Sequence, residues 1–186
     1  MNFKQTKLDG VIIIEPKVFS DDRGYFCETF RQDLLDGFLG FRINFCQDNE
    51  SKSSKNVFRG LHYQLPPFAQ SKLVRVINGK VLDFAVDIRV GSPTFGEYIA
   101  VELSSENKKQ LFIPRGFAHG FLVLSDEAIF TYKVDNFYSR ESDRGISYKS
   151  IDFTYPSDII LSDKDKVQPL LSECKELFEY GVNYYA

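Results

Sequence analysis

Two strand-like segments meet at an Asn-Gly pair in the middle of the chain. Residues 72–77 and 80–88 are rich in β-branched and aliphatic side chains, and Asn78-Gly79 separates them. Asn-Gly is the preferred two-residue loop of a β-hairpin, because both loop positions need positive φ. The pattern therefore predicts a β-hairpin here and favours an antiparallel β-protein.

The second of these segments alternates between apolar and polar side chains. In a strand, alternate residues point to opposite faces of the sheet. One face carries Leu82, Phe84, Val86 and Ile88, and the other carries Asp83, Ala85, Asp87 and Arg89. A polar face of this kind either meets water or lines a cavity.

Further strand-like segments recur along the chain with turn residues between them. They span residues 11–15, 25–31, 43–49, 97–103, 109–113, 119–124 and 128–134. Many short strands at intervals of about 8–12 residues, without helices between them, are typical of a sandwich or barrel. The 18 Phe and 10 Tyr among 186 residues support this class, because aromatic residues favour strands. We therefore predict an all-β fold, an antiparallel jelly-roll barrel.

The remaining segments are expected to be peripheral. Residues 32–38 are compatible with one short helix, and residues 50–56 read as a polar loop. From about residue 169, an apolar stripe of helical spacing predicts a C-terminal helix packed on the outside; it comprises Leu170, Leu171, Cys174, Leu177 and Phe178. The length of 186 residues fits a single domain, residues 1–186.

Charge, hydropathy and cysteine content exclude several classes of protein. A formal net charge of −3 argues against nucleic acid as the main partner, because binding to phosphate backbones needs a basic surface. No apolar run approaches the length of a membrane span, so we expect no membrane association. Three cysteines without metal-ligand spacing indicate reduced thiols and a cytoplasmic protein.

The candidate chemistry centres on two histidines, His62 and His119, each flanked closely by glycine. Their separation in sequence and the lack of an HxH pair disfavour a metal site. The chain also lacks a GxSxG nucleophile motif and a phosphate-binding GxxxxGK[ST] loop. Acid–base chemistry by His62, with Tyr132, Lys72 and a carboxylate, remains. For Arg59 to face the same cavity as His62, a β-bulge at Gly60 is needed.

Several sequence blocks resemble one known family in the same order. They are residues 21–28 (DDRGYFCE), 47–53 (QDNESKS), 56–64 (NVFRGLHYQ), 72–75 (KLVR), 86–96 (VDIRVGSPTFG), 103–107 (LSSEN), 113–121 (IPRGFAHGF), 132–133 (YK) and 161–165 (LSDKD). Together they resemble the dTDP-4-dehydrorhamnose 3,5-epimerases, from about residue 8 to residue 171. The resemblance implies a cupin-type jelly roll, a homodimer that exchanges N-terminal strands, and an epimerase that needs no metal or other cofactor.

The resemblance also implies roles for individual residues. His62 corresponds to the base that removes the protons next to the C4 ketone, and Asp165 to the carboxylate that orients it. Tyr132 corresponds to the acid that returns a proton on the opposite face, and Lys72 to the group that stabilises the enolate oxygen. The positions implied to contact the dTDP-sugar are Arg23, Phe26, Glu28, Gln47, Asn49, Arg59, His119 and Tyr138.

The implied activity is inversion of C3 and C5 of dTDP-4-dehydro-6-deoxy-D-glucose to give dTDP-4-dehydro-L-rhamnose, a step in the biosynthesis of surface polysaccharide precursors. Two related alternatives are an epimerase that acts at one carbon only and a 3,4-ketoisomerase. A third is a non-catalytic cupin that binds a nucleotide-sugar. The presence of both His62 and Tyr132 favours epimerisation.

Overall fold

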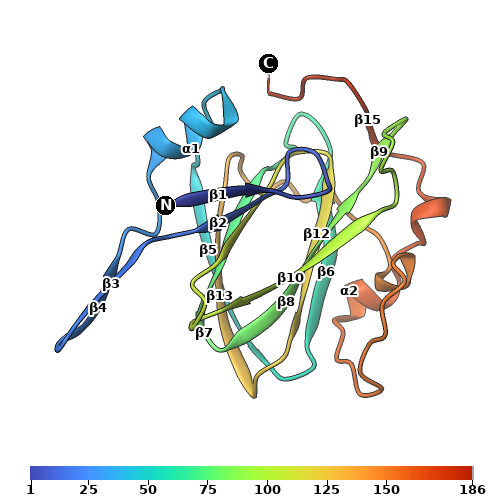
Figure 1. The fold of residues 1–186 in the computed structure, drawn as a ribbon. Coiled ribbons are helices and arrows are strands. Elements are labelled where there is room, and N and C mark those ends of the chain that lie inside the picture. Colours follow the sequence, from blue (N-terminus) through green and yellow to red (C-terminus); the bar gives the residue numbers. More distant parts are fainter. Residues whose placement is uncertain (186) are drawn as a thin grey trace.

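The computed structural model describes residues 1–185, and its body consists of two antiparallel sheets that face each other (Figure 1). The six-stranded sheet has the order β1-β2-β11-β7-β13-β5. Its strands are β1 (Asn2–Gln5), β2 (Ile12–Glu15), β11 (Gln110–Ile113), β7 (Lys72–Asn78), β13 (Glu127–Val134) and β5 (Gln47–Ser54). The five-stranded sheet has the order β10-β8-β12-β6-β14. Its strands are β10 (Tyr98–Ser104), β8 (Lys80–Asp87), β12 (Phe117–Val123), β6 (Phe58–Gln64) and β14 (Asp143–Gly145).

Smaller elements surround the two sheets. A separate hairpin, β3 (Val18–Asp21) and β4 (Gly24–Cys27), projects away from the body (Figure 1). The others are α1 (Gln32–Leu39), α2 (Asp163–Lys166), the 3₁₀ turns Tyr148–Ser150 and Leu171–Glu173, and the parallel pair of β9 (Arg89–Val90) and β15 (Phe178–Glu179). Within residues 1–185, neither helix is long and apolar enough to cross a membrane.

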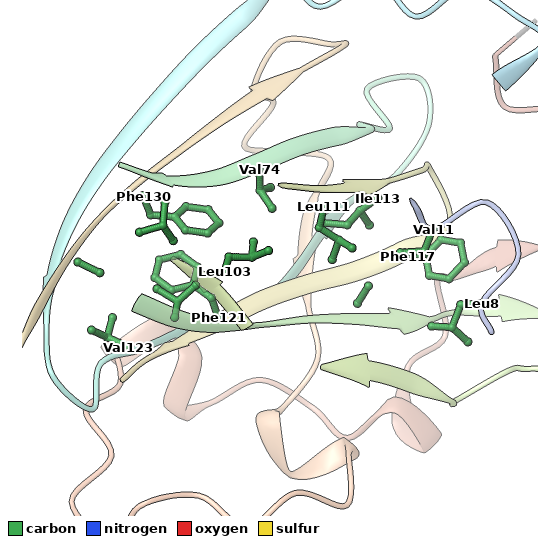
Figure 2. Close-up of a cluster of buried hydrophobic side chains, with 14 residues drawn as sticks. Leu8, Val11, Val74, Leu103, Leu111, Ile113, Phe117, Phe121, Val123 and Phe130 are labelled. Carbon is green, nitrogen blue, oxygen red and sulfur yellow. The ribbon is translucent and has the colours of Figure 1, made fainter. Parts of the chain in front are cut away.

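The main hydrophobic core lies between the two sheets. Figure 2 shows side chains of both sheets in it, among them Val74 and Phe130 of the six-stranded sheet and Leu103 and Phe121 of the five-stranded sheet. Two further clusters cover the outer faces, one between the six-stranded sheet and α1 and the other between the five-stranded sheet and the C-terminal third of the chain. Both faces of each sheet are thus covered in part, and the predicted antiparallel jelly roll is confirmed.

The predicted hairpin at Asn78-Gly79 is wrong, although both of its strands exist. β7 pairs with β11 and β13, whereas β8 pairs with β10 and β12 in the opposite sheet. The turn therefore carries the chain from one sheet to the other. Gly79 has φ +80°, and a Cβ there would lie 2.1 Å from the Glu127 carbonyl oxygen. Close packing against the neighbouring turn explains the glycine as well as a hairpin loop would.

The prediction of a polar loop at residues 50–56 is also wrong for residues 50–54, which form a strand. β5 continues to Ser54 and pairs with β13 along its whole length, from Gln47 opposite Val134 to Ser54 opposite Glu127. Because β5 is an edge strand, its polar outward side chains are typical of strands that must not pair further. Conversely, the strand expected over residues 25–31 ends at Cys27.

The C-terminal helix expected from about residue 169 is not formed. The structure has one 3₁₀ turn, Leu171–Glu173, and Cys174 then takes an extended conformation. The apolar stripe is buried in another way: Leu171 and Phe178 both pack under the five-stranded sheet, and Phe178 pairs with Arg89 on β9. A helix this short is costly to nucleate, so contacts to the sheet decide the conformation.

Candidate active site

A cavity of about 610 Å³ opens between the two sheets, and most of the residues singled out in the sequence line it. The lining includes His62, Lys72, Tyr132, Asp165, Asn49, Arg59 and His119. These residues come from five strands and one helix, because inward-facing positions of both sheets meet at this point. The structure therefore brings the four predicted catalytic side chains and three of the predicted contact residues together.

His62 and Asp165 form a hydrogen-bonded pair in this cavity. His62 Nε2 lies 2.5 Å from Asp165 Oδ1, and the side chains are 32% and 3% exposed. Asp165 sits on α2, where Ser162 caps the helix by accepting a hydrogen bond from the Asp165 backbone NH. Burial opposes ionisation of Asp165, but the bond to His62 and its charge outweigh it, so the pKa of this carboxyl lies below its usual value. An ionised, buried aspartate can orient the imidazole and stabilise its protonated form.

The predicted bulge at Gly60 is confirmed. The pairing of β6 with β12 joins His62 to His119 and Arg59 to Phe121, so β6 has one residue more than β12 in this interval. Gly60 has φ +123°, and a Cβ would lie 2.5 Å from the Gly120 Cα. Only glycine fits this position. The bulge turns Arg59 toward the cavity, where its Nε donates to Ser53 Oγ at 2.9 Å.

Lys72 is the first residue of β7 and extends into the cavity from the six-stranded sheet. Its Nζ donates a long hydrogen bond of 3.4 Å to the His62 carbonyl oxygen. Burial lowers the pKa of Lys72 to about 8, although Asp143 and Asp83 favour the charged form. The ammonium is thus mostly charged at neutral pH and is poorly solvated, which strengthens its effect on a nearby oxyanion.

Tyr132 lies on β13 and faces His62 across the cavity, since β13 and β6 belong to opposite sheets. Burial raises the pKa of Tyr132, while the charge of Arg59 acts in the other direction. The phenol is therefore protonated at neutral pH and can act as a proton donor.

A second histidine–aspartate pair is buried in the barrel. The sequence analysis singled out His119 but not its partner, Asp83. His119 Nε2 lies 2.9 Å from Asp83 Oδ2, and both side chains are buried. Burial lowers the pKa of His119 and raises that of Asp83. The polar face of residues 83–89 had indicated that Asp83 meets water or a cavity, but no sequence signal connects it to His119.

Ser51 also lines the cavity and was not singled out from the sequence. Its hydroxyl is buried and has no hydrogen-bond partner within residues 1–185. The neighbouring inward positions of β5 are satisfied: Gln47 Nε2 donates to Asn49 Oδ1 at 2.8 Å, and Ser53 accepts from Arg59. The Ser51 hydroxyl is thus unpaired between hydrogen-bonded neighbours of the same row.

Five predicted contact residues do not line this cavity: Arg23, Phe26, Glu28, Gln47 and Tyr138. Gln47 and Tyr138 lie near it, because Gln47 bonds to Asn49 and accepts from the Tyr138 backbone NH at 3.3 Å. Arg23 and Phe26 lie on the projecting hairpin, where the Arg23 side chain is 89% exposed and forms an ion pair with Asp21. Within one chain, these hairpin residues do not reach the site.

The residues of the site form pairs rather than a ligand cluster. Within residues 1–185, no three His, Cys, Asp or Glu side chains converge as a metal site would need. Each histidine is bonded to one aspartate, an arrangement that suits proton transfer.

Comparisons with known proteins agree with this geometry. A family model described as dTDP-4-dehydrorhamnose 3,5-epimerase matches residues 5–173. The dTDP-4-dehydrorhamnose 3,5-epimerase of Shigella flexneri is 57% identical over 168 residues, which are 89% of this chain and 93% of that protein. The protein of the same name from Escherichia coli strain K12 is 53% identical over 170 residues, or 89% and 92% of the two chains.

A solved structure with a bound sugar is similarly close. The crystal structure of the dTDP-6-deoxy-D-glucose-3,5-epimerase of Legionella pneumophila, in complex with dTDP-4-keto-L-rhamnose, has a TM-score of 0.91 and 46% identity. The match covers 97% of this chain and 99% of that one. With a matching family model, these identities and this cavity, the chain belongs to the dTDP-4-dehydrorhamnose 3,5-epimerase family.

Proposed function

We propose that this protein is an epimerase that inverts C3 and C5 of dTDP-4-dehydro-6-deoxy-D-glucose and yields dTDP-4-dehydro-L-rhamnose. The observation that carries the proposal is the placement of His62, with Asp165 behind it, opposite Tyr132 in one cavity that also holds Lys72. A sugar ring between the two sheets would have a base on one face and an acid on the other. Membership of the family and the sugar bound to the Legionella pneumophila relative support this substrate.

His62 is the base in this mechanism. It takes the proton from the carbon next to the C4 ketone, and Asp165 holds the imidazole in place and stabilises the imidazolium. A carbon acid is much weaker than an imidazolium, and each unit of pKa mismatch costs about 1.36 kcal/mol. Histidine alone is therefore not sufficient, and the negative charge that develops on the ketone oxygen must be stabilised.

Lys72 provides that stabilisation. Its ammonium extends into the same cavity as the His62 imidazole, and it is held in a poorly solvated position before the reaction begins. A charge that needs no reorganisation during the reaction lowers the barrier to enolate formation. Tyr132 then gives a proton to the opposite face of the enolate, which inverts the carbon.

Deuterium incorporation tests the proposed reaction. In D₂O the wild-type protein should place one deuterium at C3 and one at C5 of the product, as seen by NMR. His62→Ala should abolish incorporation at both carbons, whereas Tyr132→Phe should retain some exchange and lose inversion. Label at a single carbon or a 3-keto product would replace the proposal by one of the related activities, and a dTDP-sugar bound without exchange would indicate a non-catalytic protein.

The proposed assembly is a homodimer in which the β3–β4 hairpin of each chain completes the site of the other. The hairpin projects from the body and exposes apolar side chains, with Phe19, Tyr25 and Phe26 at 49%, 59% and 65% exposure (Figure 1). An exposed apolar patch of this kind is typical of an interface. In a dimer, Arg23, Phe26 and Glu28 would then contact the dTDP-sugar in the partner's cavity.

Mixing two inactive variants distinguishes exchange from action within one chain. Arg23→Ala and His62→Ala subunits should each be nearly inactive alone. If the hairpin acts on the partner's cavity, mixed dimers contain one intact site, and random mixing should restore about a quarter of all sites. No recovery in verified mixed dimers would refute the exchange.

We further expect the protein in the cytoplasm. The three cysteines, Cys27, Cys46 and Cys174, are free thiols, in agreement with a reducing compartment.

A further inference from the structure

The last segment of the chain follows the part that the family model matches. The match ends at residue 173, and the structure describes twelve more residues, 174–185. This segment is attached first through β15, which pairs with β9, and through the Tyr180 NH, which donates to the Val90 carbonyl oxygen at 2.9 Å. It then crosses one end of the barrel toward α1 (Figure 1). There the ring of Tyr185 packs on Phe41, with centroids 4.8 Å apart.

This end of the barrel is where the strand carrying Lys72 begins. Lys72 pairs with Ile113 of β11 on one side and with Val134 of β13 on the other. These three residues form one row across the sheet. Just beyond the row lie Ser71, Arg115 and Asp135, at the ends of the same three strands.

The Tyr185 hydroxyl is hydrogen-bonded to Ser71 before β7 and to Arg115 after β11. These two residues are in turn bonded to Asp135 after β13. Its hydroxyl accepts a hydrogen bond from the Arg115 NH at 3.1 Å and lies 2.7 Å from Ser71 Oγ, to which it can donate. Asp135 Oδ1 accepts from the Ser71 NH at 2.6 Å, and Asp135 Oδ2 accepts from Arg115 Nε at 3.2 Å. The three partners are largely buried: Ser71 is 0% exposed, and the side chains of Arg115 and Asp135 are 15% and 4% exposed.

Few contacts hold the Lys72 side chain itself, although its backbone is paired on both sides. Within residues 1–185, its ammonium has one hydrogen bond, the 3.4 Å contact to the His62 carbonyl oxygen. The position of Nζ is therefore set mainly by the backbone at the start of β7. Strand ends fray unless they are tied down, and a displacement of about 1 Å in a catalytic group can lower the rate about 100-fold.

We propose that Tyr185 is a positioning residue for Lys72: its hydroxyl fixes Ser71 and so holds the strand end from which the lysine reaches the substrate. Tyr185 itself does not touch the substrate. The inference rests on the proposed epimerase activity and extends it, since it places one determinant of the rate outside the segment that the family model covers.

Tyr185→Phe tests this inference, because it keeps the ring and removes the hydroxyl. Tyr180→Phe is the matched control: it lies on the same segment, it is 45% exposed, and its hydroxyl makes no hydrogen bond within residues 1–185. Each variant is assayed for kcat, KM and the number of sites that bind dTDP in a titration. Dividing kcat by that number removes any effect of misfolded protein.

Tyr185→Phe should lower kcat per dTDP-binding site about threefold to tenfold, with KM unchanged within about twofold, because it removes the two hydrogen bonds that join the Tyr185 hydroxyl to Ser71 Oγ and to the Arg115 NH. Tyr180→Phe should match the wild type. Ser71→Ala should reproduce part of the loss, and the double variant should lose no more than Tyr185→Phe alone, because both changes break the bond between Tyr185 and Ser71.

Two results would overturn the inference. One is a per-site kcat for Tyr185→Phe equal to that of Tyr180→Phe, and the other is full additivity with Ser71→Ala. Both presuppose a wild type that converts the sugar. If the wild type bound dTDP without turnover, the proposed function itself would fail, and the two failures are thus distinguishable.

Discussion

Replacing Gly120 by alanine should impair the site without changing any group in contact with the substrate. A Cβ at Gly120 would lie 2.6 Å from the Arg59 carbonyl oxygen and 3.1 Å from the Gly60 Cα, whereas ordinary contact begins at 3.4 Å. All the nearest atoms but one belong to backbone, so β6 and β12 must separate by about 0.8 Å. These two strands carry Arg59, His62 and His119.

The expected cost has two parts. Forcing an extra methyl group into a packed contact destabilises a protein by about 1–3 kcal/mol, so most of Gly120→Ala should remain folded. A displacement approaching 1 Å in catalytic groups lowers the rate by about 100-fold. Gly60→Ala disturbs the same contact from the side of β6, where its Cβ would lie 2.5 Å from the Gly120 Cα, and it adds the strain of φ +123°, so its free energy of unfolding should fall further, by about 2–6 kcal/mol in total.

Urea unfolding and kcat measured on the same samples test both parts. Gly40→Ala is the control, because Gly40 also has positive φ, +78°, but a Cβ there would have nothing within 4 Å. It should lose about 1 kcal/mol and keep its kcat. If Gly120→Ala were as active as Gly40→Ala, the argument that the close approach of β6 and β12 sets the geometry of the site would be refuted.

Three further predictions concern single side chains. Because burial lowers the pKa of Lys72 to about 8 and its charged form is the useful one, kcat should fall as the pH rises through about 8, and Lys72→Arg should remove this alkaline limb while lowering kcat at pH 7. Asp165→Asn should lower kcat about 100-fold or more at constant dTDP affinity, since the imidazole loses its orienting charge; near-normal kcat would exclude this role. Ser51→Ala should raise the free energy of unfolding by about 1 kcal/mol in thermal or urea unfolding, because it removes a buried hydroxyl without a partner; a loss of stability would show that the hydroxyl is bonded in solution.

The sequence predicted the parts of the fold that depend on local alternation. Residues 127–134, for example, form a strand whose inward positions include Phe130 and Tyr132, and the segment 58–64 needs its bulge at Gly60 for Arg59 and His62 to share a cavity. Both features follow from the two-residue period of a strand, which is visible in a single segment. Seven of the twelve site residues that the family resemblance implied line the cavity, six of them from strands and Asp165 from α2.

Features that depend on pairing between distant segments could not be predicted in this way. Asn78-Gly79 is compatible with a hairpin and with a crossing between sheets, and only the partners of β7 and β8 distinguish the two. Likewise, the apolar residues Leu171 and Phe178 have helical spacing, but they pack under the five-stranded sheet from a 3₁₀ turn and a short strand. The free energy of burial is similar in both cases, so the stripe alone does not determine the conformation.

The two histidines are brought together by the pairing of β6 with β12, which their spacing in the sequence does not indicate. His62 and His119 are distant in sequence, yet they are direct partners in the register of β6 and β12. Each is bonded to a different aspartate, Asp165 on α2 and Asp83 on β8, so their orientations are set independently. His62 remains 32% exposed at the cavity, whereas His119 is 7% exposed. Proton exchange with substrate and solvent requires access, so this difference in exposure supports the proposed role of His62, and not His119, as the base.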